Sequence, residues 1–334
     1  MDNCVKTEKT WLNIAKCISI LLVIHWHTYS TTVNIIRWYL SFQMPIFYFI
    51  SGYLFNNKYS CKEFLQKRIK RLVIPYYLSI PIAILSLYAE DVLLEEIKSI
   101  KEYCKITVFD YLLLYKPTTE QWFIINLFIV EVVGFFLIKY IKRNECKLLV
   151  TSIMLIIGIC LNSYSDSIYP FHIEKLFMML PFYVMGYFYQ QYEEKIKGNL
   201  NIKCVLYFIG TLCVWFVITL TQTGFAVVLY NSYGNYLLFY IGAIIGIGFI
   251  ITVSKVINKN SLMEKIGKES LLLCLTHRFL VVLLNGTIVR IVPNMNTVIK
   301  NLVALITMAI VIALILSWKK EYIVLKQKLY SIYK

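Results

Sequence analysis

Charged residues are scarce in this chain. They make up 16% of its 334 residues, whereas hydrophobic residues make up 59% and the mean hydropathy is +0.65. A soluble domain of this size does not need so much apolar material. The composition therefore excludes an ordinary soluble protein and indicates a protein that crosses a membrane several times.

Acidic residues are fewer than basic ones, with 19 Asp and Glu against 34 Lys and Arg and a formal net charge of +15. The excess cations gather in short loops between apolar segments. This is the pattern of a membrane-topology signal and not of a nucleic-acid-binding surface. We expect the lipid bilayer, and no nucleic acid, as a partner.

The nine cysteines form no CxxC or zinc-type spacing, so they indicate no metal site. Internal repeats, low-complexity tracts and linkers are also missing. We therefore expect a single membrane-embedded domain over residues 1–334.

Apolar segments long enough to cross the ~30 Å core of a bilayer recur along the chain. We predict transmembrane helices at about 11–30, 40–57, 72–90, 118–138, 148–163, 173–191, 204–222, 235–254, 270–289 and 298–318. Lys and Arg are concentrated in every second loop and in the tail, which by the positive-inside rule places both termini in the cytoplasm. The predicted fold is an all-α, multi-pass plasma-membrane protein of about ten helices.

The first segment carries ionisable residues that a span normally avoids. Lys16 and His27 are eleven residues apart, which is only about 20° off three full helical turns, so they share a face, with His27 about 16 Å further along the axis. His25 points to another face and is interpreted as structural. An imidazole has a pKa near working pH, so His27 is the candidate general base for a hydroxyl proton. The alternative is a hydrogen bond from His27 to a neighbouring helix.

A second stretch, residues 42–55, reads FQMPIFYFISGYLF. Together with the Lys16–His27 spacing, it resembles the acyltransferase 3 family, integral-membrane enzymes that O-acetylate sugars and polysaccharides. Two positions depart from the family pattern: Asn13 stands where an acidic residue is frequent, and Gln43 where a histidine is frequent. The resemblance implies acetyl-CoA as the acyl donor, a glycan acceptor and no metal.

Cations near the cytoplasmic side are candidates for binding coenzyme A. Arg68 and Arg71 match an Arg-x-x-Arg pair of the family, and two guanidiniums three residues apart on a helix can clamp one phosphate. Lys16, which matches the family's arginine, is assigned to the coenzyme as well. The alternative for Arg68 and Arg71 is topology anchoring alone.

Two residues of the predicted span over 118–138 are further candidates. Trp122, with Phe123, matches a Trp-Phe motif of the family; it suits either an interfacial aromatic belt or stacking on a sugar. Glu131 is a carboxylate in mid-span, which must be paired or face water. It is expected either to pair with a cation or to orient a catalytic histidine.

His172 and Glu174 precede the sequence LPFYVMGYF, which resembles another family motif. We expect these two residues at the outer mouth, where a glycan would arrive. The alternative is a solvated loop pair without a role in binding.

The sequence from Gly267 to Ser270, followed by His277, resembles the family's Gly-x-x-Ser motif with a downstream histidine. Ser270 suits a helix N-cap, and the resemblance adds a place in the substrate site. His277 lies two turns later on the same face and is a candidate for the catalytic site. Arg278 is assigned to a phosphate of the donor.

The predicted function is acetyl transfer from cytoplasmic acetyl-CoA to a sugar hydroxyl. The alternative is a transporter or flippase for lipid-linked glycans, with the buried charges lining its pathway. A purely structural membrane protein would leave Lys16, His27 and Glu131 without a purpose.

Overall fold

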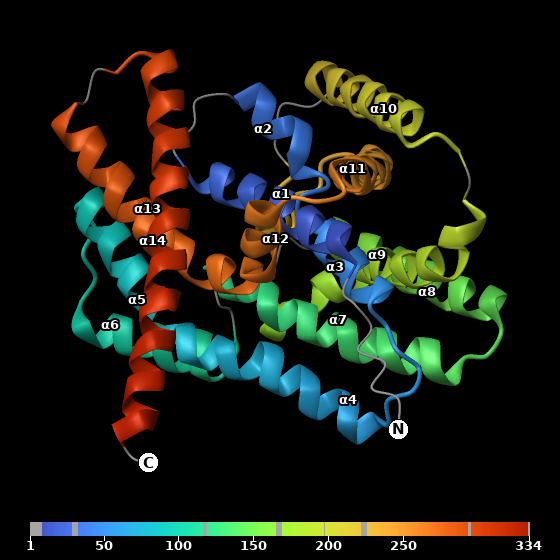
Figure 1. The fold of residues 1–334 in the computed structure, drawn as a ribbon, viewed down its shortest axis with the longest axis horizontal. Helices are drawn as coiled ribbons and strands as arrows, with labels where there is room; N and C mark the ends of the chain where they lie inside the picture. The colour runs from blue at the N-terminus through green and yellow to red at the C-terminus, as the bar shows by residue number, and fades with distance from the viewer. Residues whose placement is uncertain are drawn as a thin grey trace.

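A computed structural model describes residues 9–28, 33–115, 119–164, 169–196, 198–221, 226–292 and 295–332. Over these residues the fold is all-α (Figure 1). The helices are α1 (Thr10–His27), α2 (Val33–Leu40), α3 (Pro45–Tyr53), α4 (Cys61–Arg68), α5 (Ile74–Leu94), α6 (Ile100–Lys105), α7 (Gln121–Tyr140), α8 (Asn144–Tyr164), α9 (Ile173–Tyr192), α10 (Leu200–Thr221), α11 (Tyr236–Ile257), α12 (Ser261–Lys268), α13 (Ser270–Ile291) and α14 (Thr297–Ile332).

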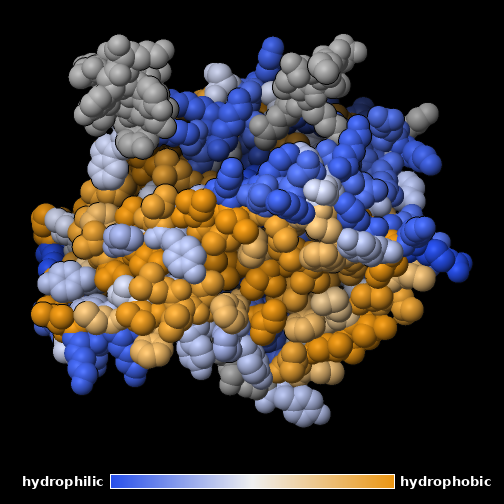
Figure 2. Space-filling model, turned by 90° about the horizontal axis from the view of Figure 1, so that it is seen from below, coloured by the Kyte–Doolittle hydropathy of each residue, from blue (hydrophilic) through white to orange (hydrophobic). Residues whose placement is uncertain are grey.

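Seven helical stretches in the described ranges are long and apolar enough to cross a membrane. They are Cys61–Leu94, Gln121–Tyr140, Asn144–Tyr164, Leu200–Thr221, Tyr236–Ile257, Ser270–Ile288 and Thr297–Lys319. The surface agrees with this, since one face shows a broad apolar band with hydrophilic residues gathered at its edges (Figure 2). The protein is therefore a multi-pass membrane protein.

The remaining three predicted spans differ from these seven. The segments predicted at 11–30 and 173–191 are the continuous helices α1 and α9, but both carry charged side chains and bury at least half of their residues inside the protein. The segment predicted at 40–57 is not one helix: α2 ends at Leu40, a turn follows, and α3 begins at Pro45. Proline lacks an N–H and fits the first turn of a helix, which explains the new start. The count of ten spans is not confirmed.

Helix α1 lies at the centre of the molecule (Figure 1). It contacts α3, α11, α12, α13 and α14, and Ile14, Ala15 and Ile20 are completely buried. Helix α12 approaches α1 very closely at Gly267. A Cβ at this position would lie 1.8 Å from the backbone oxygen of Asn13, so only glycine fits here. The glycine of the predicted Gly-x-x-Ser motif thus holds the start of α13 against α1.

Helices α3 and α9 cross with their backbones almost touching. A Cβ at Gly52 would lie 1.8 Å from the carbonyl oxygen of Tyr183, and one at Gly186 would lie 1.9 Å from the carbonyl oxygen of Phe49. Small residues allow this kind of close packing between membrane helices. The glycines of the two sequence motifs therefore form one structural crossing.

Glu193, just after α9, ties together four helices at one end of the bundle. Its carboxylate accepts hydrogen bonds from Lys9 at 2.7 Å, Tyr53 at 2.5 Å and Lys255 at 2.6 Å. Burial raises the pKa of the Glu193 carboxyl, but the hydrogen bonds from Lys255, Lys9 and Tyr53 outweigh it and lower the pKa to about 2. This carboxylate stays charged at neutral pH and links the starts or ends of α1, α3, α9 and α11.

Candidate active site

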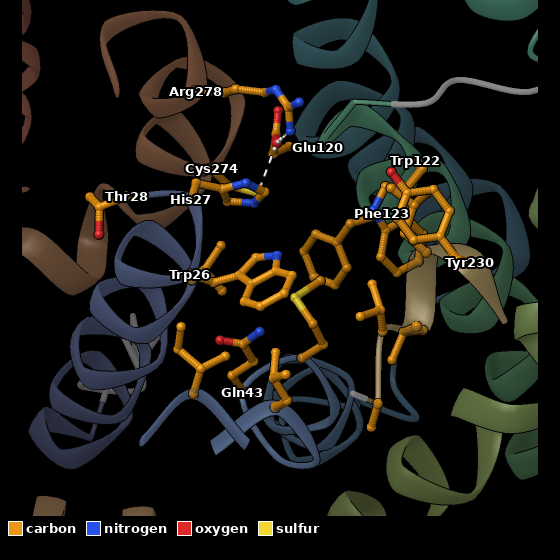
Figure 3. Close-up of a pocket in the computed structure, with 18 of the residues that line it drawn as sticks. Trp26, His27, Thr28, Gln43, Glu120, Trp122, Phe123, Tyr230, Cys274 and Arg278 are labelled. Carbon is orange, nitrogen blue, oxygen red and sulfur yellow. Dashed lines mark hydrogen bonds and ion pairs between the residues drawn. The ribbon is translucent and has the colours of Figure 1, made fainter. Parts of the chain in front are cut away.

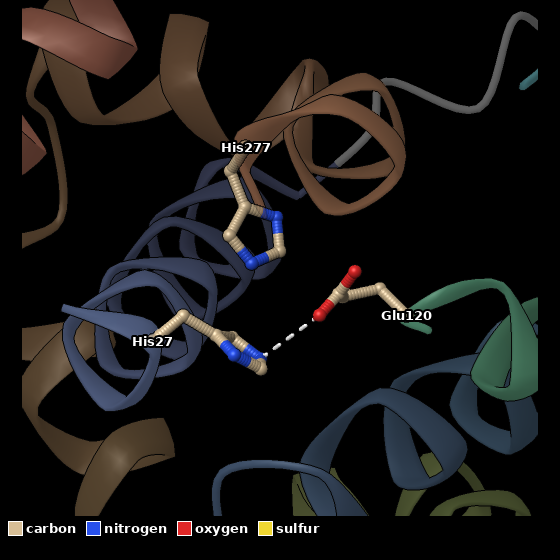
Figure 4. A group of neighbouring side chains, drawn as sticks. All are labelled: His27, Glu120 and His277. Carbon is tan, nitrogen blue, oxygen red and sulfur yellow. Dashed lines mark ion pairs between the residues drawn. The ribbon is translucent and has the colours of Figure 1, made fainter. Parts of the chain in front are cut away.

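The end of α1 places His27 beside a carboxylate that the sequence analysis did not identify. Atom Nε2 of His27 lies 3.4 Å from Oε1 of Glu120, which occupies the turn just before α7 (Figure 4). The side chain of His27 is 19% exposed and that of Glu120 is 8% exposed. A histidine paired with a carboxylate in this way has a fixed orientation and a stabilised cation, the arrangement of catalytic triads.

His277 completes the cluster from α13. Its Nδ1 lies 2.8 Å from the backbone oxygen of Leu273 and 3.0 Å from that of Cys274, so Nδ1 carries the proton and donates. Atom Nε2 is then an acceptor, and it is buried with no hydrogen-bond partner among the described residues. The ring centroids of His27 and His277 lie 5.1 Å apart. The structure thus brings together two histidines that were predicted from distant segments.

Arg278 holds Glu120 in place from the same helix. One of its terminal nitrogens lies 3.1 Å from Oε1 of Glu120, and the other lies 2.6 Å from Oε2 of Glu90 at the end of α5. The guanidinium of Arg278, which was predicted to bind a phosphate of the donor, is therefore already paired with two carboxylates. In this arrangement Arg278 positions Glu120 and joins α5, α7 and α13.

The ligand atoms of His27, Glu120 and His277 lie within 4.8 Å of one another. Two imidazoles and a carboxylate form a set that zinc accepts in enzymes. However, the guanidinium of Arg278 already lies against the same oxygen of Glu120, and a second cation there would be repelled. The donor set fits proton transfer better than metal binding.

A cavity of about 420 Å³ opens beside His27 (Figure 3). Its wall is mostly apolar, with aliphatic and several aromatic side chains, and a few polar groups converge on it, as is typical of small-molecule sites. Its lining residues include Trp26, His27, Gln43, Glu120, Trp122 and Tyr230.

Trp122, a candidate substrate-binding residue, lines this cavity, and buried side chains pack behind it. The ring of His172 lies 5.9 Å from that of Trp122, and Nζ of Lys175 lies 5.6 Å from the Trp122 ring. Lys175 also contacts His172 at 3.1 Å and Glu174 at 2.5 Å. His172 and Glu174 are buried, so the alternative of a solvated loop pair is wrong. Their place at a mouth that receives a glycan stays a prediction.

Glu131 lies away from the two histidines. It accepts a hydrogen bond from Ser51 at 2.5 Å and forms an ion pair with Nε of Arg68 at 2.9 Å. Of the two alternatives for this carboxylate, the structure shows the pair with a cation. Arg71 remains exposed. The guanidinium of Arg68 is thus paired with Glu131, whereas that of Arg71 is open to solvent.

Lys16 and Ser270 are not among the residues that line the cavity. Nζ of Lys16 is 3.3 Å from Oδ1 of Asn13, on the part of α1 that packs against α12. Ser270 is the first residue of α13, and the N-cap is Glu269, which makes no capping hydrogen bond. The interpretation of Ser270 as the N-cap is therefore wrong by one residue.

His25, interpreted as structural, has a partner of its own: its Nδ1 lies 2.6 Å from the hydroxyl of Tyr39. Sequence reasoning missed Glu90, Glu120 and the lining role of Gln43. Glu120 lies two residues before Trp122, at the start of a predicted span. A carboxylate at a membrane boundary is not unusual, so it did not stand out as a candidate. The predicted topology could have indicated Glu120. The span over 11–30 ends near His27, and the span over 118–138 begins on the same side of the membrane.

These features define a membrane protein with an acid–base pair buried beside a small-molecule cavity. A comparison with protein-family models gives a match to the acyltransferase domain of the acyltransferase 3 family over residues 9–318. The chain belongs to this family and is an acyltransferase. Searches of curated proteins and of solved structures each find no similar protein.

Proposed function

We propose that this acyltransferase moves an acetyl group from cytoplasmic acetyl-CoA to a hydroxyl of a cell-surface or lipid-linked sugar in the plasma membrane. The observation that carries the proposal is the His27–Glu120 pair on the wall of a cavity with several aromatic side chains. A general base serves the hydroxyl, and aromatic faces serve the apolar face of a sugar ring.

The chemistry needs one proton to move and return. Glu120 accepts the Nε2–H of His27, which leaves the lone pair on Nδ1. That nitrogen takes the proton of the acceptor hydroxyl as its oxygen attacks the thioester carbonyl carbon. The tetrahedral intermediate then collapses, the C–S bond breaks, and the coenzyme A sulfur takes the proton back from the imidazolium. The products are a sugar acetate and the coenzyme thiol.

Supporting residues act around this pair. Glu120 stabilises the imidazolium while it exists, and Arg278 and Glu90 keep that carboxylate in place. His277 packs against His27 and limits how its ring can turn. Trp122 receives the sugar, with His172 and Glu174 acting through it.

The donor is proposed to enter from the cytoplasm, the side on which the Lys- and Arg-rich loops lie. Arg71 is the exposed candidate for its phosphates, and Lys16 lies along α1 between that side and His27. Arg68 contributes mainly through its pair with Glu131.

The test uses membranes that contain the protein or its His27→Asn variant, supplied with acetyl-CoA labelled in the acetyl group. Mass analysis of the glycan fraction is expected to show labelled O-acetyl groups with the parent protein and a large loss with the variant. Unlabelled glycan in both samples, together with a changed amount of glycan at the cell surface, would support a transporter instead.

A further inference from the structure

A second cavity, of about 650 Å³, lies on a different face of α13 from the candidate active site. Helices α5, α13 and α14 form its walls, with Pro75, Leu272, Phe279 and Ile315 among the lining residues. The active-site cavity instead uses Cys274 and Arg278 of the same helix. The two cavities are therefore separate sites on two faces of α13.

One end of this second cavity, here called the mouth, is polar and carries net positive charge. It consists of Lys268, Glu269, Trp318 and Lys319. Lys319 forms an ion pair with Glu269, which leaves Lys268 as the remaining charge. Lys268 is exposed and has no hydrogen bond or ion pair within the described part of the chain. The mouth thus offers one free ammonium group, and it also contains the indole of Trp318.

Beyond the mouth the walls are dry. Outside the mouth, Thr276 is the one polar side chain among the described residues that line this cavity. Its hydroxyl already donates a hydrogen bond to the backbone oxygen of Leu272 at 2.8 Å. From Leu271 to Leu280 the cavity follows α13 for about 13 Å. A ligand lying there finds hydrocarbon along its length and hydrogen-bonding groups only at its end.

This distribution selects between two anionic ligands. The pantetheine arm of coenzyme A carries amide groups, and burying an amide without a partner is costly. A fatty acyl chain has no such groups and fits dry walls. Basic pockets between membrane helices on the cytoplasmic side are known to suit anionic lipid head groups.

We infer that this cavity binds an anionic phospholipid, with one acyl chain between α5, α13 and α14 and its phosphate at Lys268. Trp318 stands at the end of the apolar stretch Thr297–Lys319, and an indole at the end of a span usually meets the head-group region. Glu269 faces the same phosphate, but its charge is neutralised by Lys319. The inference does not depend on the acyl-transfer reaction proposed above.

The test uses the full-length protein in nanodiscs made of equal parts phosphatidylglycerol and phosphatidylcholine. After transfer to a mild detergent, mass spectrometry of the intact protein counts the lipids that stay bound. The parent protein is expected to retain phosphatidylglycerol over phosphatidylcholine. Lys268→Gln is expected to lower that preference about fivefold, the contribution of one cation near a lipid phosphate.

Lys265→Gln is the matched control, because Lys265 is exposed on the same short helix and does not line the cavity. It should keep the parental preference. Thr276→Phe, which fills the cavity, should lower retention of either lipid. Equal losses in Lys265→Gln and Lys268→Gln, an unchanged ratio in Lys268→Gln, or displacement of the lipid by added coenzyme A would each overturn the inference.

Discussion

Atom Nε2 of His27 lies 3.4 Å from Oε1 of Glu120, and the same oxygen lies 3.1 Å from the guanidinium of Arg278. One carboxylate oxygen therefore faces both the candidate base and a fixed cation. The cation holds the carboxylate still, and the carboxylate in turn fixes the imidazole. The two buried carboxylates in this part of the chain therefore differ in role. Glu120 pairs with the candidate base, whereas Glu131 pairs with Arg68.

Glu120→Gln and Glu131→Gln should have different effects. Glu120→Gln should lower the acyl-transfer rate by about 10²–10⁴, because His27 loses the charge that orients it and stabilises its cation. Glu131→Gln should leave the rate of the folded protein nearly unchanged and lower its stability, because Arg68 loses its partner. Turnover and thermal unfolding of both variants, measured on the same preparations, check this; a rate loss confined to Glu131→Gln would reverse the roles.

Composition predicted the all-α membrane class, and the ionisable residues of the first segment made His27 a candidate, which the structure places on the wall of the cavity. The sequence did not predict which carboxylate meets His27. That depends on depth in the bundle: Glu131 lies eleven residues beyond Glu120, or about 16 Å further along α7, and this brings it to Arg68 instead. The break before Pro45 was also missed, since residues 40–57 are largely apolar and hydropathy does not register a turn.

Metal removal should leave the activity unchanged. The guanidinium of Arg278 occupies the electrostatic position next to Glu120 that a cation at this cluster would need. Dialysis of the purified protein against a strong chelator, followed by the transfer assay, is the measurement. A loss of activity that added zinc restores would show that His27, Glu120 and His277 hold a metal.

Gly52→Ala should destabilise the protein by about 1–3 kcal/mol or more, the usual cost of overpacking. The new methyl group would meet the backbone of Tyr183 at 1.8 Å, and backbone there cannot move aside without separating α3 from α9. Gly210→Ala is the control, since its methyl group meets only the side chain of Ile245 at 2.9 Å. Thermal unfolding in detergent should rank Gly52→Ala well below Gly210→Ala, and equal midpoints would argue against the close crossing.

Arg68→Ala and Arg71→Ala should separate stability from donor binding. Arg68 is paired with the buried Glu131, and removing one partner of a buried pair typically costs about 3–5 kcal/mol. Arg71 is exposed, so Arg71→Ala should fold normally and raise the KM for acetyl-CoA. A parental KM in Arg71→Ala would remove this arginine from the donor site.

His27→Asn should insert and fold, because asparagine keeps hydrogen-bonding capacity toward Glu120. It cannot take a proton from the acceptor hydroxyl, so acyl transfer should fall by about 10²–10⁴. His25→Asn is the matched control: His25 is two residues away on the same helix, and its Nδ1 lies 2.6 Å from the hydroxyl of Tyr39 rather than near Glu120. It should retain much of the parental rate. Transfer of labelled acetyl to membrane glycan, normalised to the amount of each protein in the same membranes, is the measurement. An inactive His25→Asn beside an active His27→Asn would show that the base is the other histidine.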